Sequence, residues 1–506
     1  MKSKSILLLF MLLLTGLAPL FAQTDSLNND KVFRPRLHFS PAAHWINDPN
    51  GMVYVNGVYH LYFQYHPYSS VWGPMHWGHA TSKDLISWKE EPVALYPDSL
   101  GYIFSGSAVL DVNNTSGFGK NGKAPLVAIF THHNSKTEKE RIDFQTQSIA
   151  FSNDNGFTWT KYSGNPVIQN PGIADFRDPK VIWHAATKKW VMTLATKDCV
   201  TFYSSPDLKN WTKESTFGKT AGAHGGVWEC PDLIEMELNG QQKWVLLVSI
   251  NPGAPNGGSA TQYFVGEFDG HQFISNQTDT RWIDYGPDNY AGVTWSNTGK
   301  QKLFMGWMSN WNYAQQLPTT LWRNAMTIAR ELRLVESGGE LYVASKPVAA
   351  LSNYEVKQNV LQNITVNKQT AVINKTGILH FPARFNIKST AGESFAVRFY
   401  NTVTGEELKI GYDQPSDHYF IDRSRSGIIN FYPGFAAKHT VPRISSNKQI
   451  ELNLLLDACS VELFADAGLS VMTSLFYPTE KYTHAELLSP GKTNIEEFSY
   501  FTYKQK

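Results

Sequence analysis

The chain has 506 residues, and its 45 lysines and arginines against 44 aspartates and glutamates give a formal net charge of +1. A near-neutral chain has no basic excess with which to hold nucleic acid or an anionic membrane, so we expect neither as a partner. The three cysteines (Cys199, Cys230 and Cys459) are too few and too widely spaced for a disulfide framework, and we expect buried thiols. The length allows more than one domain.

The first 22 residues are typical of a secretory signal peptide. Lys2 and Lys4 precede an apolar run from Ile6 to Leu14, which is too short to span a bilayer comfortably. We expect cleavage after Ala22 and export to the periplasm or the medium. No cysteine follows the run and no later apolar stretch is long enough for a span, so we expect no membrane anchor.

Short segments rich in glycine, proline and aromatic residues, with little helical periodicity, predict an all-β chain. Five apolar strands that follow a turn recur at intervals of 54 to 67 residues; their markers are Tyr59, Leu126, Trp190, Trp244 and Leu303. A second pattern, a turn of the form S-x-D…W, recurs at Ser82–Trp88, Ser152–Trp159 and Ser205–Trp211. Repeats of this length, each built from several short strands, indicate the blades of a propeller. We therefore predict a five-bladed β-propeller over residues 33–345.

The pattern changes beyond Ala350. Strands such as Gly377–Phe385 and Gln449–Leu456 alternate polar and apolar residues, which is typical of antiparallel strands with one wet face. We predict a β-sandwich over residues 351–506, with the boundary between Leu334 and Leu351. Its expected role is to pack against the propeller.

Three blades carry an acidic residue shortly before the marker strand. Asp48 lies 11 residues before the first marker, Asp178 12 before the third and Glu229 15 before the fourth, and each is closely followed by proline. Equivalent strands of a propeller converge on its axis, so these carboxylates should meet there, repel one another and raise at least one pKa. A fold does not need this arrangement, whereas hydrolysis of a glycosidic bond uses one protonated and one ionised carboxyl group.

Polar and aromatic residues that suit a sugar accompany these acids. We expect them to bind substrate: Asn47, Gln64, Trp72, Phe104, Ser105, Arg177 and Trp311. Two histidine pairs, His76 with His79 and His132 with His133, lack a third ligand at a recognisable spacing, so we expect no metal. The chain also has no phosphate-binding glycine loop and no G-x-S-x-G motif, and we expect no cofactor.

Six motifs in order make the chain resemble glycoside hydrolase family 32, which includes invertases, inulinases and levanases. They are Trp45–Gly51, Phe63–Pro67, Phe104–Ser107, Arg177–Pro179, Glu229–Asp232 and Gly306–Trp311. The resemblance covers nearly the whole chain beyond the signal peptide, and the family fold is a five-bladed propeller followed by a β-sandwich. It implies that Asp48 is the nucleophile, Glu229 the acid/base and Asp178 the transition-state stabiliser.

The resemblance implies a retaining β-fructosidase whose substrate is a fructan or sucrose. Gly306–Ala314, followed by Leu317-Pro-Thr-Thr, is more similar to exo-acting levanases and inulinases than to plant or yeast invertases, so we expect an exo-enzyme. An endo-levanase, a sucrose-preferring invertase and a transfructosylase are alternatives. A non-catalytic fructan-binding protein and an inverting glycosidase acting on arabinan or xylan are further ones. The sequence indicates no oligomeric state.

Overall fold

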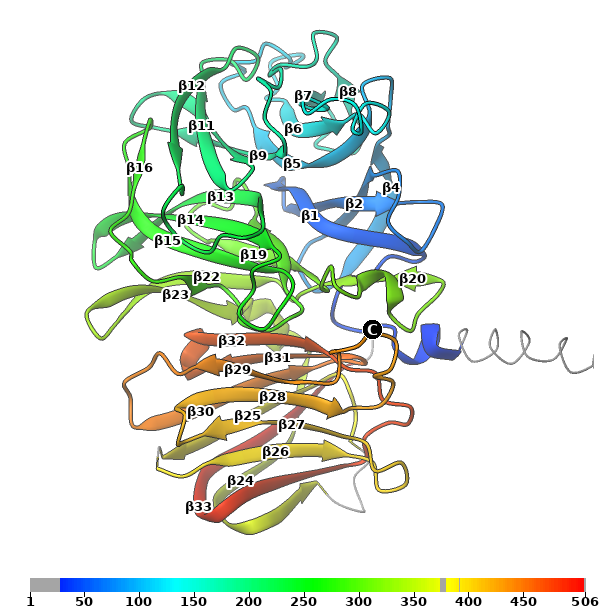
Figure 1. Ribbon diagram of the computed structural model, residues 1–506, viewed down its shortest axis with the longest axis vertical. Helices are drawn as coiled ribbons and strands as arrows, with labels where there is room; N and C mark the ends of the chain where they lie inside the picture. The colour runs from blue at the N-terminus through cyan, green and yellow to red at the C-terminus, as the bar shows by residue number, and fades with distance from the viewer. Residues whose placement is uncertain (1–27, 374–378, 391, 505–506) are drawn as a thin grey trace, which may run out of the picture.

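Two all-β units stack along the long axis of the molecule, with the propeller above the C-terminal sheets (Figure 1). The computed structural model describes residues 28–373, 379–390 and 392–504, so the expected signal peptide lies outside the described residues. The predicted fold class, a five-bladed propeller followed by a sandwich, is confirmed. Within the described ranges, no helix is both long and apolar enough to cross a membrane.

Each blade is a small antiparallel sheet. The first blade contains β1 (His44–Val55), β2 (Val58–His66), β3 (His76–Ser82) and β4 (Trp88–Leu95). The second contains β5 (Tyr102–Leu110), β6 (Leu126–His133), β7 (Gln145–Ser152) and β8 (Thr160–Lys161). The third contains β9 (Phe176–His184), β10 (Lys189–Thr196), β11 (Cys199–Ser205) and β12 (Thr212–Phe217).

The last two blades are less regular. The fourth contains β13 (Val227–Leu238), β14 (Gln241–Asn251), β15 (Ala260–Phe268), β16 (Phe273–Ile274) and β17 (Arg281–Trp282). The fifth contains β18 (Tyr290–Thr294), β19 (Leu303–Met308), β21 (Ala325–Met326), β22 (Arg330–Ser337) and β23 (Glu340–Pro347). Between β19 and β21 lie the short helix η1 (Ala314–Gln316) and β20 (Trp322–Arg323), which pairs in parallel with β1. This pairing ties the last blade to the first.

The repeats read from sequence correspond to fixed places in a blade. All five marker residues lie at or near the start of a blade's second strand, which is almost fully buried between its neighbours. The three S-x-D…W turns each follow a third strand, and in each the serine hydroxyl donates to the aspartate two residues on, at 3.0, 2.7 and 3.2 Å. In the first of them, Asp84 also accepts the backbone N–H groups of Ile86 and Ser87, so its side chain closes the turn.

The innermost strand of every blade is interrupted by a β-bulge at the same place. In each bulge two residues face one residue of the second strand; the flanking residues are Ile46/Pro49, Ile103/Gly106, Arg177/Lys180, Glu229/Asp232 and Tyr290/Val293. Three bulges place a non-glycine residue in the left-handed region, with φ of 66° at Asp178, 46° at Cys230 and 53° at Ala291. Such bulges bend a strand and redirect its side chains, at a cost in backbone strain.

The C-terminal domain starts after the helix η2 (Ala349–Tyr354). Its strands are β24 (Glu355–Ile373), β25 (Ala383–Thr390), β26 (Phe395–Tyr400), β27 (Glu407–Asp413), β28 (His418–Arg425), β29 (Lys438–Pro442), β30 (Gln449–Leu456), β31 (Ser460–Ala465), β32 (Ser470–Leu475) and β33 (His484–Tyr503), with η3 (Asp466–Gly468) before β32. The long strand β33 pairs first with β26 and then with β25, so it belongs to both layers. Phe385 and Phe399, one on each of those partners, pack in the shared core with ring centroids 4.9 Å apart.

Buried charges join the two domains. Arg330 of the fifth blade, fully buried, donates to Asp284 of the propeller at 2.9 Å and to Glu462 of β31 through Nε at 3.0 Å. Asp284 in turn accepts the backbone N–H of Thr473 at 2.8 Å. A second buried pair, Arg423 with Asp288 at 2.7 Å, crosses the same boundary. Because the Arg330–Glu462 and Arg423–Asp288 pairs cross the boundary, separation of the domains would leave buried charges without these partners.

His38 lies at the centre of this interface. Its Nδ1 is 2.8 Å from Asp457 and its Nε2 is 2.7 Å from Glu462, and all three side chains are fully buried. Burial alone would lower the pKa of His38, but the hydrogen bonds with the two carboxylates outweigh it and raise the pKa to about 9. The imidazole is therefore held as a cation, which bridges two acids of the C-terminal domain.

We expect the stability of the protein to fall as the pH rises from 6.5 to 9. The unfolded chain releases the His38 proton near pH 6.5 and the folded chain near 9, so the stabilisation is complete below pH 6.5 and is lost as the pH passes through 9. The loss amounts to about 3 kcal/mol. Thermal unfolding of the wild type and of His38→Gln across this pH range tests it. An equal pH slope in both proteins would contradict the assignment.

Candidate active site

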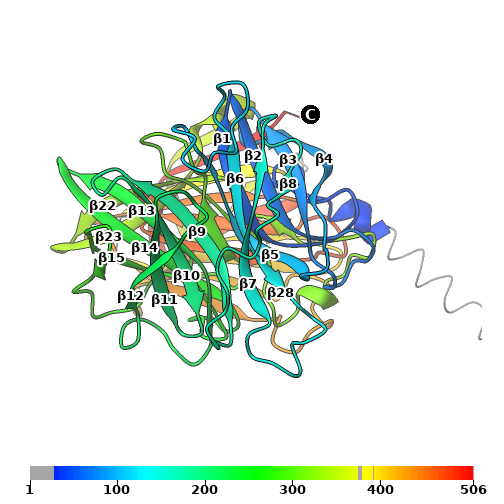
Figure 2. The same ribbon diagram turned by 90° about the horizontal axis from the view of Figure 1, so that it is seen from above.

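A pocket of about 240 Å³ opens at one end of the propeller axis. The view from above shows the strands of the propeller blades in front of the C-terminal sheets (Figure 2). The structure places all ten residues predicted for the site around this one pocket: Asn47, Asp48, Gln64, Trp72, Phe104, Ser105, Arg177, Asp178, Glu229 and Trp311. They come from four different blades and from the segment that follows β19.

Asp48 lies within the bulge of β1, and its carboxylate is fixed by neighbouring donors. Asn47 donates from Nδ2 to Oδ1 at 2.9 Å, and Ser105 of β5 donates from its hydroxyl to Oδ2 at 2.7 Å. The indole N–H of Trp45 holds the amide oxygen of Asn47 at 2.8 Å, so the donors are themselves oriented. Burial and the charge of Glu229 raise the pKa of Asp48, while the two hydrogen bonds oppose the rise.

Asp178 lies in the equivalent bulge of β9. Its backbone N–H donates to the hydroxyl of Thr131 at 3.0 Å, and its Oδ2 accepts the backbone N–H of Cys230 at 3.0 Å. The thiol of Cys230 is 3.6 Å from both Asp178 and Asp48, so it separates the two carboxyl groups. Burial raises the pKa of Asp178, Arg177 opposes this, and the charges of Glu229 and Asp48 add to it. The strained backbone at Asp178 thus aims a carboxyl group into an already acidic pocket.

Glu229 is bound on both of its oxygens. Arg177 donates to Oε1 from Nε at 3.0 Å and from Nη2 at 2.8 Å, and its Nη1 donates to Asp175 at 2.6 Å. The hydroxyl of Tyr290 donates to Oε2. Burial raises the pKa of Tyr290 well above its usual value, so the phenol remains a donor. Glu229 therefore differs from Asp48 in that its partners are a cation and a phenol.

Aromatic rings wall the pocket. Trp72 packs edge-on against Phe104 at 6.3 Å, and Phe104 stacks on His133 at 4.1 Å. Trp311 stacks on Trp45 at 5.9 Å. Among the described residues, Gln64 Nε2 finds no hydrogen-bond partner although it is buried beside the pocket, so it is available to a hydroxyl group of a ligand. Flat apolar walls with a few polar groups suit a sugar ring.

Each of the three acids lies at or beside the bulge of its own blade, but at a different position relative to that bulge. Glu229 occupies the residue before the bulge, Asp178 its first residue and Asp48 its second, and each of these steps changes the spacing to the marker by one residue. The other two residues in the spacing of Glu229 come from the β13–β14 hairpin, which is longer by two residues than the β9–β10 hairpin. Tyr290, which the sequence reasoning missed, occupies the same position as Glu229 one blade later. Its distance of 13 residues from the fifth marker, between the 12 and 15 of two acids, could have revealed it. Asp175, His133, Glu138 and Gln145 also line the pocket and were not predicted.

The histidine pairs do not form a metal site with the acids. His79 contacts His60 at 3.0 Å inside the first blade, and His132 contacts the hydroxyl of Ser148 at 2.7 Å inside the second. Across the described ranges, no three histidine, cysteine, aspartate or glutamate side chains are grouped so that they could hold a metal ion.

A pocket with one carboxyl group held by neutral donors, another held by a cation and a phenol, and aromatic walls is equipped for glycosidic bond hydrolysis, which defines a glycoside hydrolase. The chain belongs to glycoside hydrolase family 32. The family model for the N-terminal domain matches residues 38–345 and the model for the C-terminal domain matches residues 347–503. Within the structure the fifth blade runs to Pro347, the last residue of β23.

Curated relatives align over most of the chain. A levanase of Bacillus subtilis is 46% identical over 496 residues, which cover 95% of this chain and 72% of that protein. An extracellular exo-inulinase of Aspergillus awamori is 39% identical over 509 residues, covering 93% and 94%. The crystal structure of exo-inulinase from Aspergillus awamori superposes with a TM-score of 0.84 at 36% identity, covering 94% of this chain and 98% of that one. A fructofuranosidase from Schwanniomyces occidentalis complexed with fructose gives 0.85 at 34%, covering 94% and 99%.

Removal of the Ser105 hydroxyl should shift the acid side of the pH–activity profile upward. The hydrogen bond favours the ionised form of Asp48, so Ser105→Ala raises the pKa of Asp48 and the activity that needs this carboxylate is lost at a higher pH. The measurement is kcat/KM for a β-fructofuranoside against pH. Ser116→Ala, which removes a buried hydroxyl bonded to Asp111 outside the lining of the pocket, should leave the profile unchanged. Identical acid limbs in the Ser105 variant and the wild type would contradict the prediction.

Proposed function

We propose that this glycoside hydrolase is a retaining exo-β-fructosidase that releases terminal β-D-fructofuranosyl residues from levan or inulin, and fructose from sucrose. The observation that carries the proposal is the meeting of Asp48 and Glu229 in one small pocket, each with a different set of partners. The names of the relatives, a levanase and exo-inulinases, support the substrate class. We further propose the roles of nucleophile for Asp48, acid/base for Glu229 and transition-state stabiliser for Asp178.

In the first step Glu229 transfers its proton to the glycosidic oxygen while Asp48 attacks the anomeric carbon, C2, of the fructosyl unit. The bond from C2 to the leaving oxygen breaks, the leaving group departs as an alcohol, and a fructosyl ester forms on Asp48. Arg177 binds Oε1 of Glu229, which leaves Oε2 to carry the proton for transfer while it also accepts the hydroxyl of Tyr290. Ser105 and Asn47 keep Asp48 oriented for attack.

In the second step Glu229, now ionised, removes a proton from water. The resulting hydroxide attacks C2, the ester to Asp48 breaks, and fructose leaves with the configuration of the substrate. Asp178 accepts hydrogen bonds from ring hydroxyl groups, and these bonds strengthen as positive charge develops at C2. The backbone N–H of Cys230 holds Asp178 in place for this role.

The size of the pocket supports the exo mode. Its volume of about 240 Å³, walled by Trp72, Phe104 and Trp311, is below the range of about 300–1,000 Å³ usual for drug-sized ligands. It suits a single terminal furanose unit better than an internal segment of a polymer. An endo-levanase would need a groove that admits the chain on both sides.

We also propose that the protein is exported. The first residues have a signal-peptide pattern, and relatives are described as extracellular exo-inulinases.

We further propose the domain division expected from the sequence, with a propeller of residues 33–345 and a sandwich of residues 351–506. In this division the sandwich packs against the propeller and stabilises it.

A product time course on levan and on inulin, resolved by chain length, tests the exo assignment. We expect fructose as the only product from the earliest points, because the pocket accepts one terminal unit at a time. The polymer that is hydrolysed faster identifies the preferred linkage. A ladder of oligosaccharides would show endo cleavage, and longer products than the substrate would show transfer to sugars in place of water.

The two proposed roles of the carboxyl groups can be separated by leaving group. With sucrose, both Asp48→Asn and Glu229→Gln should reduce kcat by more than about 1,000-fold. With a β-fructofuranoside of an acidic phenol, which departs without a proton, Glu229→Gln should still form the fructosyl-enzyme, whereas Asp48→Asn should not. A rapid burst of phenol, one equivalent per enzyme, is the readout. A burst from the Asp48 variant would overturn the assignment of the nucleophile.

A further inference from the structure

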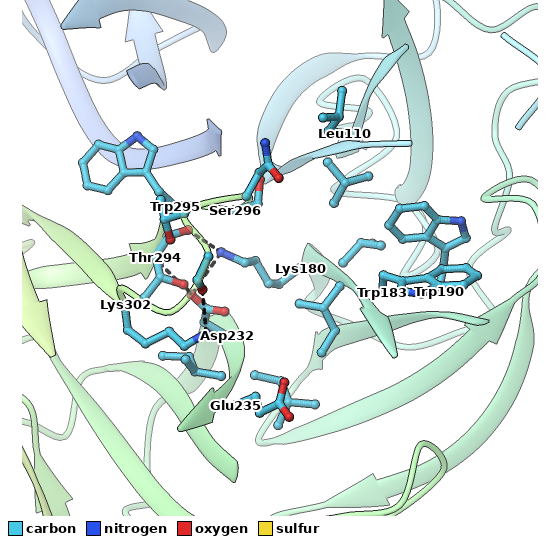
Figure 3. A pocket seen from close by; sticks show the side chains of 18 of the residues that line it. Leu110, Lys180, Trp183, Trp190, Asp232, Glu235, Thr294, Trp295, Ser296 and Lys302 are labelled. Carbon is cyan, nitrogen blue, oxygen red and sulfur yellow. Dashed lines mark hydrogen bonds and ion pairs between the residues drawn. The ribbon is translucent and has the colours of Figure 1, made fainter. Parts of the chain in front are cut away.

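A buried ion pair joins the innermost strands of the third and fourth blades (Figure 3). Lys180 of β9 donates from Nζ to Asp232 Oδ2 at 3.0 Å and to the carbonyl oxygen of Thr294 at 2.6 Å. The same Oδ2 accepts the N–H of Thr294 at 2.6 Å and its hydroxyl at 2.7 Å. The side chains of Lys180 and Asp232 are 7% and 1% exposed, so both charges have been removed from water.

Each member of the pair directly follows a bulge at which an acid lies. Lys180 follows the bulge that contains Asp178, and Asp232 follows the bulge that Glu229 precedes. The equivalent residues of the other three blades are Pro49, Gly106 and Val293, none of which is charged. Charge at this position therefore occurs only in the two blades that supply Asp178 and Glu229, and with opposite sign in each.

The two strands belong to different sheets, and side chains connect them at three successive heights. Nearest the pocket, Arg177 binds Glu229; next, Asp178 accepts the backbone N–H of Cys230; deepest, Lys180 binds Asp232. The first two connections involve the acids themselves. The third touches neither acid, yet it fixes the spacing of the strands immediately below them.

Stability alone does not account for a charged connection here. A buried ion pair costs a large desolvation free energy, and well-packed apolar residues in its place are often neutral or stabilising. What apolar residues do not provide is a directional bond that sets the distance between two strands to a fraction of an ångström. Errors of about 1 Å in the placement of reacting groups cost on the order of 100-fold in rate.

We propose that Lys180 and Asp232 form a positioning pair that fixes Glu229 relative to Asp178, and thereby relative to the substrate. This inference rests on the proposed function, since it assigns the acid/base role to Glu229. The pair acts through the bulges and touches no substrate.

A cavity of about 400 Å³ adjoins the pair and is separate from the substrate pocket. It is lined by Lys180, Asp232, Thr294, Trp183 and Lys302, among others, and shares no lining residue with the substrate pocket. Figure 3 shows the lysine side chain crossing this cavity toward Asp232 and Thr294. When Lys180 is replaced by alanine, a small molecule that enters this cavity can thus occupy the space of the missing side chain while substrate occupies its own pocket.

The first test is rescue of Lys180→Ala by propylammonium, which has the atoms that the substitution removes. We expect kcat for sucrose to fall about 10- to 100-fold with KM changed less than threefold, and propylammonium to restore kcat in a saturable, substrate-independent manner. Propanol, which matches the size but not the charge, should not restore it, and the wild type should not respond to either. A folded Lys180→Ala enzyme with wild-type kcat would overturn the proposal.

Lys180→Ala leaves the buried carboxylate of Asp232 unpaired and can fail to fold. A second variant tests the proposal in that case as well. The double variant Lys180→Met/Asp232→Leu removes both charges together and should keep the melting temperature within a few degrees of the wild type. We expect it to retain the reduced kcat, to show a shifted alkaline limb of the pH–kcat profile, and to ignore propylammonium. A merely structural role would move neither the limb nor kcat in a stable variant.

The matched control is Lys243→Met/Glu267→Gln, which removes an exposed ion pair of the fourth blade and should behave as the wild type. If the Lys180/Asp232 double variant is stable and has wild-type kcat and pH dependence, the positioning role is refuted. Failure of the proposed function is recognised separately, because the wild type itself would then release no fructose from levan, inulin or sucrose.

Discussion

The arrangement of the whole active pocket depends on one constraint, the bulge that interrupts all five innermost strands at the same height. A regular strand would point alternate side chains toward and away from the axis. The extra residue in each bulge breaks this alternation, and the left-handed backbone at Asp178 and Cys230 turns the chain further. Ring closure then brings the five interruptions together, so the side chains that meet there come from residues far apart in sequence.

That convergence concentrates negative charge in a space with little water. Three carboxyl groups approach one another, and the protein offsets their repulsion with donors specific to each: Ser105 for Asp48, the Cys230 backbone for Asp178 and Arg177 for Glu229. The chemistry proposed here needs this unequal treatment, because one carboxyl group must attack and another must deliver a proton. The strained backbone of the bulges serves the same chemistry, because it directs a carboxyl group into the pocket.

The architecture could be predicted from sequence because propeller blades repeat. The apolar second strands and the S-x-D…W turns recur with little variation, and the three acids lie 11 to 15 residues before the marker residues of those strands. The contact of Tyr290 with Glu229 and the Lys180–Asp232 pair could not be found in this way. These contacts depend on which side chains meet across neighbouring blades and on the position of each residue relative to its bulge. Spacing along the chain determines neither of them. The charged boundary between the domains, centred on His38 and Arg330, likewise joins residues more than 100 positions apart.

This boundary limits how the protein can be recombined. Each domain contributes buried charges that pair with charges of the other, with His38, Arg330 and Asp288 on one side and Asp457, Glu462 and Arg423 on the other. A chimera that joined this propeller to a sandwich from a distant homologue would therefore have to carry over the complementary set of acids and cation. The two halves are units of folding architecture but not interchangeable modules, and their interface sequences are expected to change together in evolution.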